Sequence, residues 1–166
     1  KGIDFRLSNK PSDLNFGSIH NEKSNQLLTS YFKSISPMSN LENIQILIND
    51  RYIKSILSAE TIIWFDFKSI FSTNRSVMDY IEIAKQYQTV IISEIPVLTE
   101  NMENEARRFI ALIDEFYERN VKLIYTSETS FEKLYQGKKL VFEYERTKSR
   151  LSEMASQKYI ELAHKP

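Results

Sequence analysis

The fold is decided by residues 89–127, which read TVIISEIPVLTENMENEARRFIALIDEFYERNVKLIYTS. The stretch begins with the apolar run Thr89–Ile95, which ends before Pro96 and is typical of a buried strand. From Glu103 to Arg119 apolar side chains recur every three or four residues and predict an amphipathic helix. The apolar run Val121–Thr126 predicts another strand. Strand, helix and strand in this order predict parallel strands joined by a crossover helix.

The same alternation continues on the N-terminal side of this stretch. Residues 61–67 form a further apolar run, and Ser76–Tyr87 has helical spacing. Ser76 is a natural N-cap, and Asp79 occupies the capping-box position three residues later. This segment therefore adds one more strand and one more helix to the predicted sheet.

On the C-terminal side the sequence predicts helices. Residues 130–135 predict one or two helical turns, closed by Gly137. Residues 143–163 are mostly helical, with a break near Ser156.

The first third of the chain predicts smaller elements. Residues 21–34 predict a short helix and residues 35–42 a linker. Two strands at 44–49 and 52–57 meet at Asn49-Asp50, a sequence typical of a tight hairpin turn. The helix is expected to place four side chains on one face: Leu27, Leu28, Tyr31 and Phe32. We therefore expect an α/β fold with a mostly parallel sheet and flanking helices, plus an N-terminal helix and a small β-hairpin.

Composition excludes several classes of function. The 22 basic and 22 acidic side chains balance, so no overall field favours nucleic acid or an anionic membrane. There is no cysteine, and the two histidines, His20 and His164, lie near opposite ends, so we expect no metal site and no catalytic histidine. The sequence has no run of about 20 apolar residues, so it predicts no membrane-spanning helix. The phosphate-binding pattern G-x-x-x-x-G-K-[ST] is absent.

Asp114 and Glu115 follow apolar residues, as the acidic pair of a Walker B strand does. The run that contains them has helical periodicity, however. We therefore expect these carboxylates to pair with Arg107, Arg108, Arg119 or a neighbouring element rather than to hold Mg²⁺.

Two pairs of basic side chains are candidate binding or catalytic groups. Arg146 and Arg150 lie one helical turn apart, and a guanidinium is a planar fork suited to phosphate oxygens. The alternative is that both form surface salt bridges, with Glu143, Glu145 or Glu153. Arg107 and Arg108 either extend into solvent or contact a phosphate or a partner.

Thr126 and Ser127 end a predicted strand, which is where α/β folds place functional groups. Their hydroxyls are expected either to orient a phosphate or to cap the following helix.

Six strings carry a resemblance to a known family: Gly2–Arg6, Ser76–Tyr80, Glu105–Arg119, Val121–Ile124, Leu134–Gly137 and Phe142–Met154. Together they resemble the ZapE family, AAA+-related ATPases of bacterial division whose mitochondrial relatives are called AFG-one-like. The resemblance covers most of the chain from about residue 61. The short connection between Gly137 and Phe142 is similar to that of the bacterial members.

The resemblance implies a P-loop-NTPase-like fold that lacks the P-loop. It implies that residues 1–41 connect, through one short helix, from an ATPase core upstream of Lys1, and that residues 42–166 form a C-terminal α/β domain. The parent protein would bind ATP and Mg²⁺ in that upstream core, and this segment alone would not hydrolyse ATP. The family further implies a cytoplasmic protein that binds the tubulin-like division-ring protein FtsZ. A homo-oligomer is a further expectation.

Two hypotheses follow from the resemblance. In the first, Arg150 and Arg146 act as arginine fingers on a nucleotide bound elsewhere, and the expected cofactor contacts are Arg107, Arg108, Thr126 and Ser127. Ser93-Glu94 would then stand where a Walker B strand carries Asp-Glu. In the second, the chain is a non-catalytic module for protein interaction or oligomerisation. The first hypothesis requires an exposed arginine at a subunit interface, whereas the second predicts that both guanidinium groups are paired within the domain.

Overall fold

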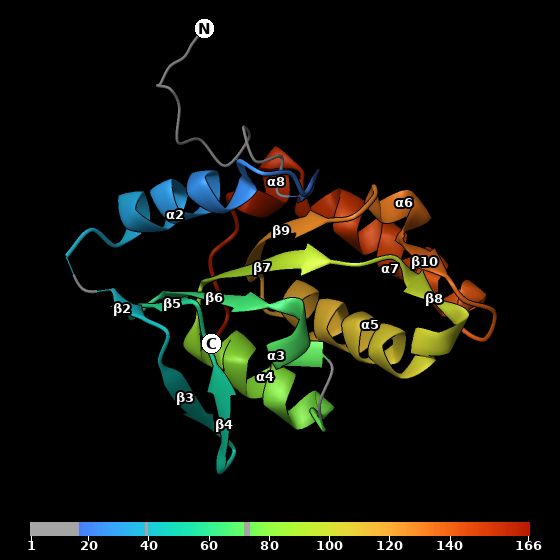
Figure 1. The fold of residues 1–166 in the computed structure, drawn as a ribbon, viewed down its shortest axis with the longest axis horizontal. Helices are drawn as coiled ribbons and strands as arrows, with labels where there is room; N and C mark the ends of the chain where they lie inside the picture. The colour runs from blue at the N-terminus through green and yellow to red at the C-terminus, as the bar shows by residue number, and fades with distance from the viewer. Residues whose placement is uncertain (1–16, 39, 72–73) are drawn as a thin grey trace, which may run out of the picture.

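A central sheet with helices on both faces forms the body of the protein (Figure 1). The structure, a computed structural model, describes residues 17–38, 40–71 and 74–166. In chain order the elements are β1 (Gly17–Ile19), α2 (Ser24–Ile35), β2 (Leu41–Glu42), β3 (Gln45–Ile48), β4 (Arg51–Lys54), β5 (Leu57–Ser58), β6 (Ile62–Asp66), α3 (Phe67–Phe71), α4 (Val77–Gln86), β7 (Thr89–Ile95), β8 (Leu98–Thr99), the 3₁₀ turn η1 (Glu100–Met102), α5 (Glu103–Glu118), β9 (Lys122–Ser127), α6 (Phe131–Leu134), β10 (Tyr135–Gln136), α7 (Val141–Met154) and α8 (Gln157–Ile160).

The main sheet has six strands in the order β1-β9-β7-β6-β5-β2. Strands β1, β9, β7 and β6 pair in parallel, whereas β5 runs antiparallel to both β6 and β2. The prediction of a mostly parallel α/β sheet flanked by helices is confirmed.

The connections decide which helix covers which face. Because β6, β7 and β9 are neighbours in chain order, right-handed crossovers place α4 and α5 on one face of the sheet. The connection from β1 to β2 crosses the sheet in the opposite direction, and its helix α2 lies on the other face (Figure 1).

Alternating side chains of the strands supply two separate apolar cores. In β6, Ile63 and Phe65 point toward the core beneath α3, α4, α5 and α7, and Ile62 and Trp64 point toward the core beneath α2. All four are almost fully buried. This explains why β6 is an apolar run without alternation, since both faces of a parallel strand are covered.

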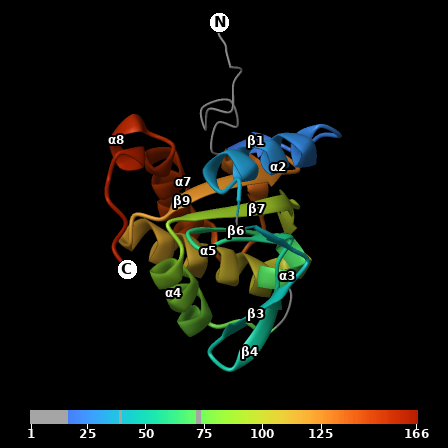
Figure 2. The same ribbon diagram turned by 90° about the vertical axis from the view of Figure 1, so that its left-hand side faces the viewer.

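The predicted hairpin is present as β3 and β4, with register Leu47↔Tyr52 across the strands. Asn49 and Asp50 have φ angles of 50° and 66°, the left-handed conformation that two-residue hairpin turns require. Figure 2 shows the hairpin extending past the sheet on the side of α3 and α4. The Asn49 side chain donates to the carbonyl oxygen of Met78 at 2.9 Å and so attaches the turn to α4.

Several local predictions are confirmed and others are wrong. The capping position of Asp79 is confirmed, since its carboxylate accepts the Ser76 N–H at 3.0 Å. The break near Ser156 is also confirmed, because α7 ends at Met154 and α8 begins at Gln157. Leu27, expected on the buried face of α2, is 50% exposed. Gly137 does not close α6, because β10 intervenes between them.

The division of the chain at residue 41 stays a prediction. Within its described part, the expected connector contributes both β1, which pairs with β9, and α2, whose Leu28 and Phe32 are fully buried against the sheet.

Candidate functional site

The two candidate arginine fingers lie on α7, next to α5 (Figure 1). Both bind one carboxylate of α5: the Arg146 Nη2 atom is 3.1 Å from Asp114 Oδ2, and Arg150 Nη1 donates to Asp114 Oδ1. The Arg150 guanidinium also lies over the Tyr117 ring, 4.9 Å from its centroid. The two arginines therefore join α7 to α5 through a partly buried network.

This pairing corrects one prediction and confirms another. The expected partners of Arg146 and Arg150 were glutamates of their own helix, but the observed partner is Asp114 of α5. The Asp114-Glu115 carboxylates were expected to pair with Arg107, Arg108, Arg119 or a neighbouring element, and this is confirmed for Asp114, which pairs with α7. Local spacing pointed to nearby glutamates because it cannot reveal a carboxylate 32 or 36 residues away.

The other expected cofactor contacts fall in two further places. Arg107 and Arg108 lie in the first half of α5, where Arg108 Nη1 donates to the carbonyl oxygen of Phe71 at 2.8 Å. Thr126 and Ser127 lie at the end of β9 and are buried. Among the described residues, no hydrogen bond or ion pair links the α7 arginines, the α5 arginines and the β9 hydroxyls into one site.

A polar cluster occupies the carboxyl ends of β1, β7 and β9. The Thr126 Oγ1 atom is 2.8 Å from His20 Nδ1 and accepts the N–H of Glu94 at 2.9 Å. His20 Nε2 lies 3.8 Å from Glu94 Oε1. A pocket of about 280 Å³ lies at this cluster, and its lining includes His20, Glu94 and Glu128. Sequence reasoning gave His20 no role, because the residue that it contacts is 106 positions away.

Within this cluster, Glu94 has an unusual backbone. Its φ is 61°, and it lies where the pairing of β7 with β9 shifts register between Ile92 and Ile95. Strained backbone of this kind is concentrated at functional sites. The preceding residue, Ser93, is buried and accepts the indole N–H of Trp64 at 2.9 Å. The expected correspondence of Ser93-Glu94 to the acidic pair of a Walker B strand stays a prediction, and Ser93 has a hydroxyl bonded to Trp64 in place of a carboxylate.

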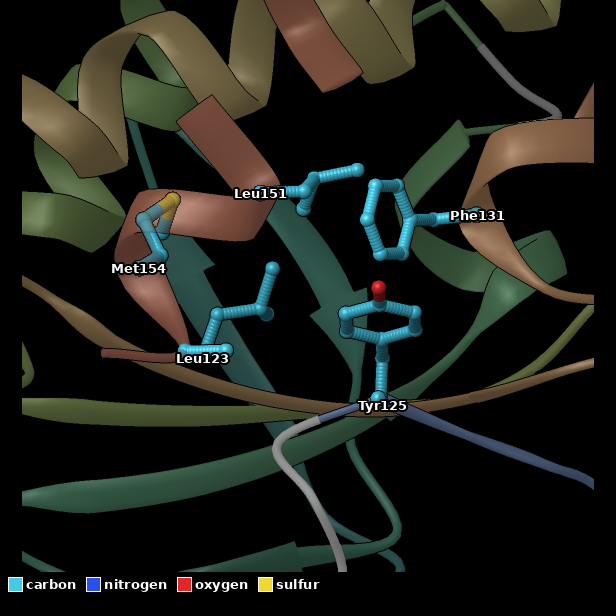
Figure 3. Close-up of a pocket in the computed structure, with 7 residues that line it drawn as sticks. Leu123, Tyr125, Phe131, Leu151 and Met154 are labelled. Atoms are coloured by element: carbon cyan, nitrogen blue, oxygen red, sulfur yellow. The ribbon is translucent and has the colours of Figure 1, made fainter. Parts of the chain in front are cut away.

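A smaller pocket beneath α7 is apolar. Its walls are formed by Leu123, Phe131, Leu151 and Met154, and the Tyr125 hydroxyl points into it (Figure 3). Burial raises the pKa of Tyr125 far above its ordinary value, so this hydroxyl stays protonated at neutral pH. Gly17 closes the pocket, and a Cβ atom at that position would lie 2.3 Å from Cζ of Tyr125. The pocket offers no acid or base for chemistry.

Comparison with known proteins identifies the family. The family model described as AFG1-like ATPase matches residues 1–163. The chain belongs to the AFG1-like ATPase family. No solved structure matches the chain.

Relatives within and beyond bacteria agree with this assignment. The chain is 35% identical over 164 residues to the cell division protein ZapE of Escherichia coli K12, covering 98% of this chain and 44% of that protein. It is 36% identical over 76 residues to lactation elevated protein 1 homolog B of Danio rerio, covering 46% of this chain and 15% of that protein. The chain thus spans less than half the length of these relatives.

The part of the chain that the structure describes contains neither a metal-binding cluster nor a membrane-spanning helix. No group of three or more His, Cys, Asp or Glu side chains there could hold a metal ion. In the same residues no helix is long and apolar enough to cross a membrane.

Proposed function

We propose that this chain is the non-hydrolysing C-terminal region of an ATP-driven cell-division protein, and that it serves as an interaction module. The family assignment and the likeness to E. coli ZapE, a cell division protein, support the setting. In this proposal the module acts in the cytoplasm, contributes to a homo-oligomer, and binds a division-ring protein, for which the family resemblance points to FtsZ.

The observation that carries the proposal is the pairing of Arg146 and Arg150 with Asp114. Arg150 is held from three sides, since its guanidinium contacts Asp114, lies over Tyr117 and has Glu118 Oε1 at 4.0 Å. Only 23% of its side chain is exposed. An arginine already neutralised within its own domain is better suited to bracing two helices than to stabilising a distant phosphate.

The residues of this chain do not fit a hydrolytic site for ATP and Mg²⁺. The sequence has no G-x-x-x-x-G-K-[ST] loop, and Ser93, which the resemblance aligns with the first carboxylate of a Walker B strand, has a hydroxyl that accepts the Trp64 indole N–H. In the proposed function both are bound in another part of the complete protein, and no step of hydrolysis is assigned to residues here.

A second candidate is the supply of an arginine to the nucleotide of a neighbouring subunit. The observation that favours it is the exposure of Arg146, 48% of whose side chain is accessible although it is paired. For this function a neighbour's phosphate would have to displace Asp114.

The test measures ATP hydrolysis by the complete protein as wild type, Arg150→Ala and Asp114→Ala. If the arginines are structural, both variants lose the same contact, keep a rate near wild type, and show similar decreases in stability. If Arg150 reaches a nucleotide, Arg150→Ala loses about a hundredfold or more in rate, roughly 2.7 kcal/mol in barrier. Asp114→Ala then keeps the rate or raises it, because it frees the arginine.

Nucleotide binding and circular dichroism control for misfolding, and Arg150→Lys serves as a milder variant. A hundredfold loss confined to the Arg150 variants, with nucleotide still bound and the fold intact, would overturn the interaction-module proposal in favour of arginine supply.

A further inference from the structure

A pocket of about 240 Å³ lies between the start of α4 and the first half of α5. Three arginines line it: Arg75, from the segment before α4, and Arg107 and Arg108 of α5. Asn104 adds an amide, and Val77 and Ala111 add apolar surface. The pocket therefore combines three positive charges with a partly apolar wall.

These charges are not neutralised by the pocket itself. No Asp or Glu lines it, and none of the three arginines forms an ion pair with any described residue. Asp79 is near enough to act on Arg75, but its carboxylate already binds Arg51 Nη2 at 2.8 Å and the N–H of Ser76 at 3.0 Å. The α7 arginines differ, because they share Asp114.

Neutral acceptors hold two of the three guanidinium groups in place. Arg108 Nη1 donates to the Phe71 carbonyl at 2.8 Å, and Arg75 Nε donates to the Ser69 carbonyl at 3.1 Å. Carbonyl oxygens fix the orientation of a guanidinium but leave its charge intact. Each guanidinium has five N–H donors, so donors remain for a ligand. Burial lowers the pKa of Arg75, and Arg51 lowers it further, although Asp79 acts in the opposite direction.

We propose that this arginine pocket binds a phosphate group, either as free inorganic phosphate or as part of a nucleotide. Arginine forks match phosphate oxygens in bidentate geometry. A phosphate monoester carries close to two negative charges at neutral pH, which suits three cations better than the single charge of a carboxylate. The proposal does not depend on the interaction-module function, since it rests on the pocket alone.

The test reads the arginine side chains directly by NMR. The Nε–Hε resonances of Arg75, Arg107 and Arg108 are followed in the complete protein while inorganic phosphate, or Mg²⁺ with ATP, is titrated. The resonance of Arg119, at the opposite end of α5, is the internal control. We expect saturable shifts of the pocket resonances with a dissociation constant of about 1 mM or below. Because the signals come from the pocket, they report the surroundings of its guanidinium groups and not the total nucleotide bound.

Variants separate a specific site from general charge. Arg107 is exposed and makes no side-chain hydrogen bond among the described residues, so Arg107→Gln is expected to fold and to weaken phosphate binding about tenfold. Arg107→Lys, which keeps the charge but loses the fork, is expected to fall between wild type and Arg107→Gln. The matched control is Lys85→Gln, which removes one positive charge from an exposed position at the other end of α4 and should bind as wild type does.

The outcomes decide both the site and the source of the phosphate. Saturation by ATP at lower concentrations than by inorganic phosphate identifies a nucleotide, and the reverse order identifies free phosphate. The proposal is overturned if the pocket resonances do not saturate with either, if Lys85→Gln weakens binding as much as Arg107→Gln, or if acetate at equal concentration produces the same shifts.

Discussion

At the scale of single residues, Glu94 is where the backbone departs most clearly from the sheet around it. Its φ of 61° lies in the left-handed region, which glycine adopts most readily. The bulge directs its N–H to Thr126 Oγ1 and its carboxylate, 60% exposed, toward His20. Backbone strain of this kind makes the Glu94 side chain a candidate for a functional role.

The strain at Glu94 can be separated from the side chain by two substitutions. Both Glu94→Gly and Glu94→Ala remove the carboxylate, but only glycine adopts a φ of 61° without steric cost. We expect the glycine variant to be more stable than the alanine variant by about 1 kcal/mol. Urea denaturation measures the difference. Equal stability, or a more stable alanine variant, would show that the conformation at this position is not strained.

At the scale of elements, α8 is a single turn that Tyr159 joins to α5 and β9. Ser156 begins the turn and accepts the N–H of Tyr159 at 3.2 Å. The Tyr159 hydroxyl donates to the carbonyl oxygens of Val121 at 2.7 Å and Phe116 at 3.2 Å, and its ring stacks on Tyr117. The same aromatic pair therefore joins the C-terminal turn to the helix that carries Asp114.

Removing the Tyr159 hydroxyl tests how firmly α8 is anchored. In Tyr159→Phe the buried hydrogen bond to Val121 is lost while the ring remains, and we expect a decrease of about 1 to 2 kcal/mol in the free energy of unfolding. Tyr52→Phe is the matched control, because Tyr52 is 62% exposed and should change stability by less than about 0.5 kcal/mol. Equal effects of the two substitutions would argue against an anchoring role.

At the scale of the whole molecule, Glu103 connects the start of α5 to the segment before α7. Its carboxylate accepts the Tyr135 hydroxyl at 2.6 Å and the N–H groups of Lys138 and Lys139 at 2.8 and 2.9 Å. These bonds, that from Tyr135 above all, lower the pKa of Glu103 below its ordinary value of 4.5. Protonation of this one carboxylate therefore loosens the contact between two parts of the fold.

The sign of the resulting pH dependence follows from the lowered pKa. The Glu103 contribution is fully present above the unfolded-state pKa near 4.5 and is lost as the pH falls through the lower folded-state pKa. We expect stability to decrease on acidification over this range, and Glu103→Gln to show a smaller decrease. Urea midpoints measured across the acidic range check this. A variant with the same pH dependence as wild type would contradict it.

Much of the fold could be predicted because its central elements have strong periodicity. The strand at Thr89–Ile95 was predicted with the bounds that are observed, and the helix from Glu103 ends one residue before the predicted Arg119. The five-residue helix α3 and the two-residue strands β2 and β5 were not predicted, because elements so short have no period of their own and form through tertiary contacts.

The sites were harder to predict, because their partners are distant in sequence. Arg146 and Arg150 were recognised as a pair, but not Asp114 as their shared partner. Arg75 was not singled out at all, since only the packing of α4 against α5 brings it to the pocket of Arg107 and Arg108. Side-chain chemistry thus identified candidate groups, and only the topology assembled them.

The close approach of Gly17 to Tyr125 also constrains how this sequence can evolve. A side chain at position 17 would overlap the ring at position 125, which lies beside it in the β1–β9 register. A larger residue at position 17 requires the ring at position 125 to shift or to be replaced by a smaller side chain. Residues 17 and 125 are therefore expected to change together during evolution. Covariation between them in a set of orthologues would indicate that β1 keeps the same register against β9.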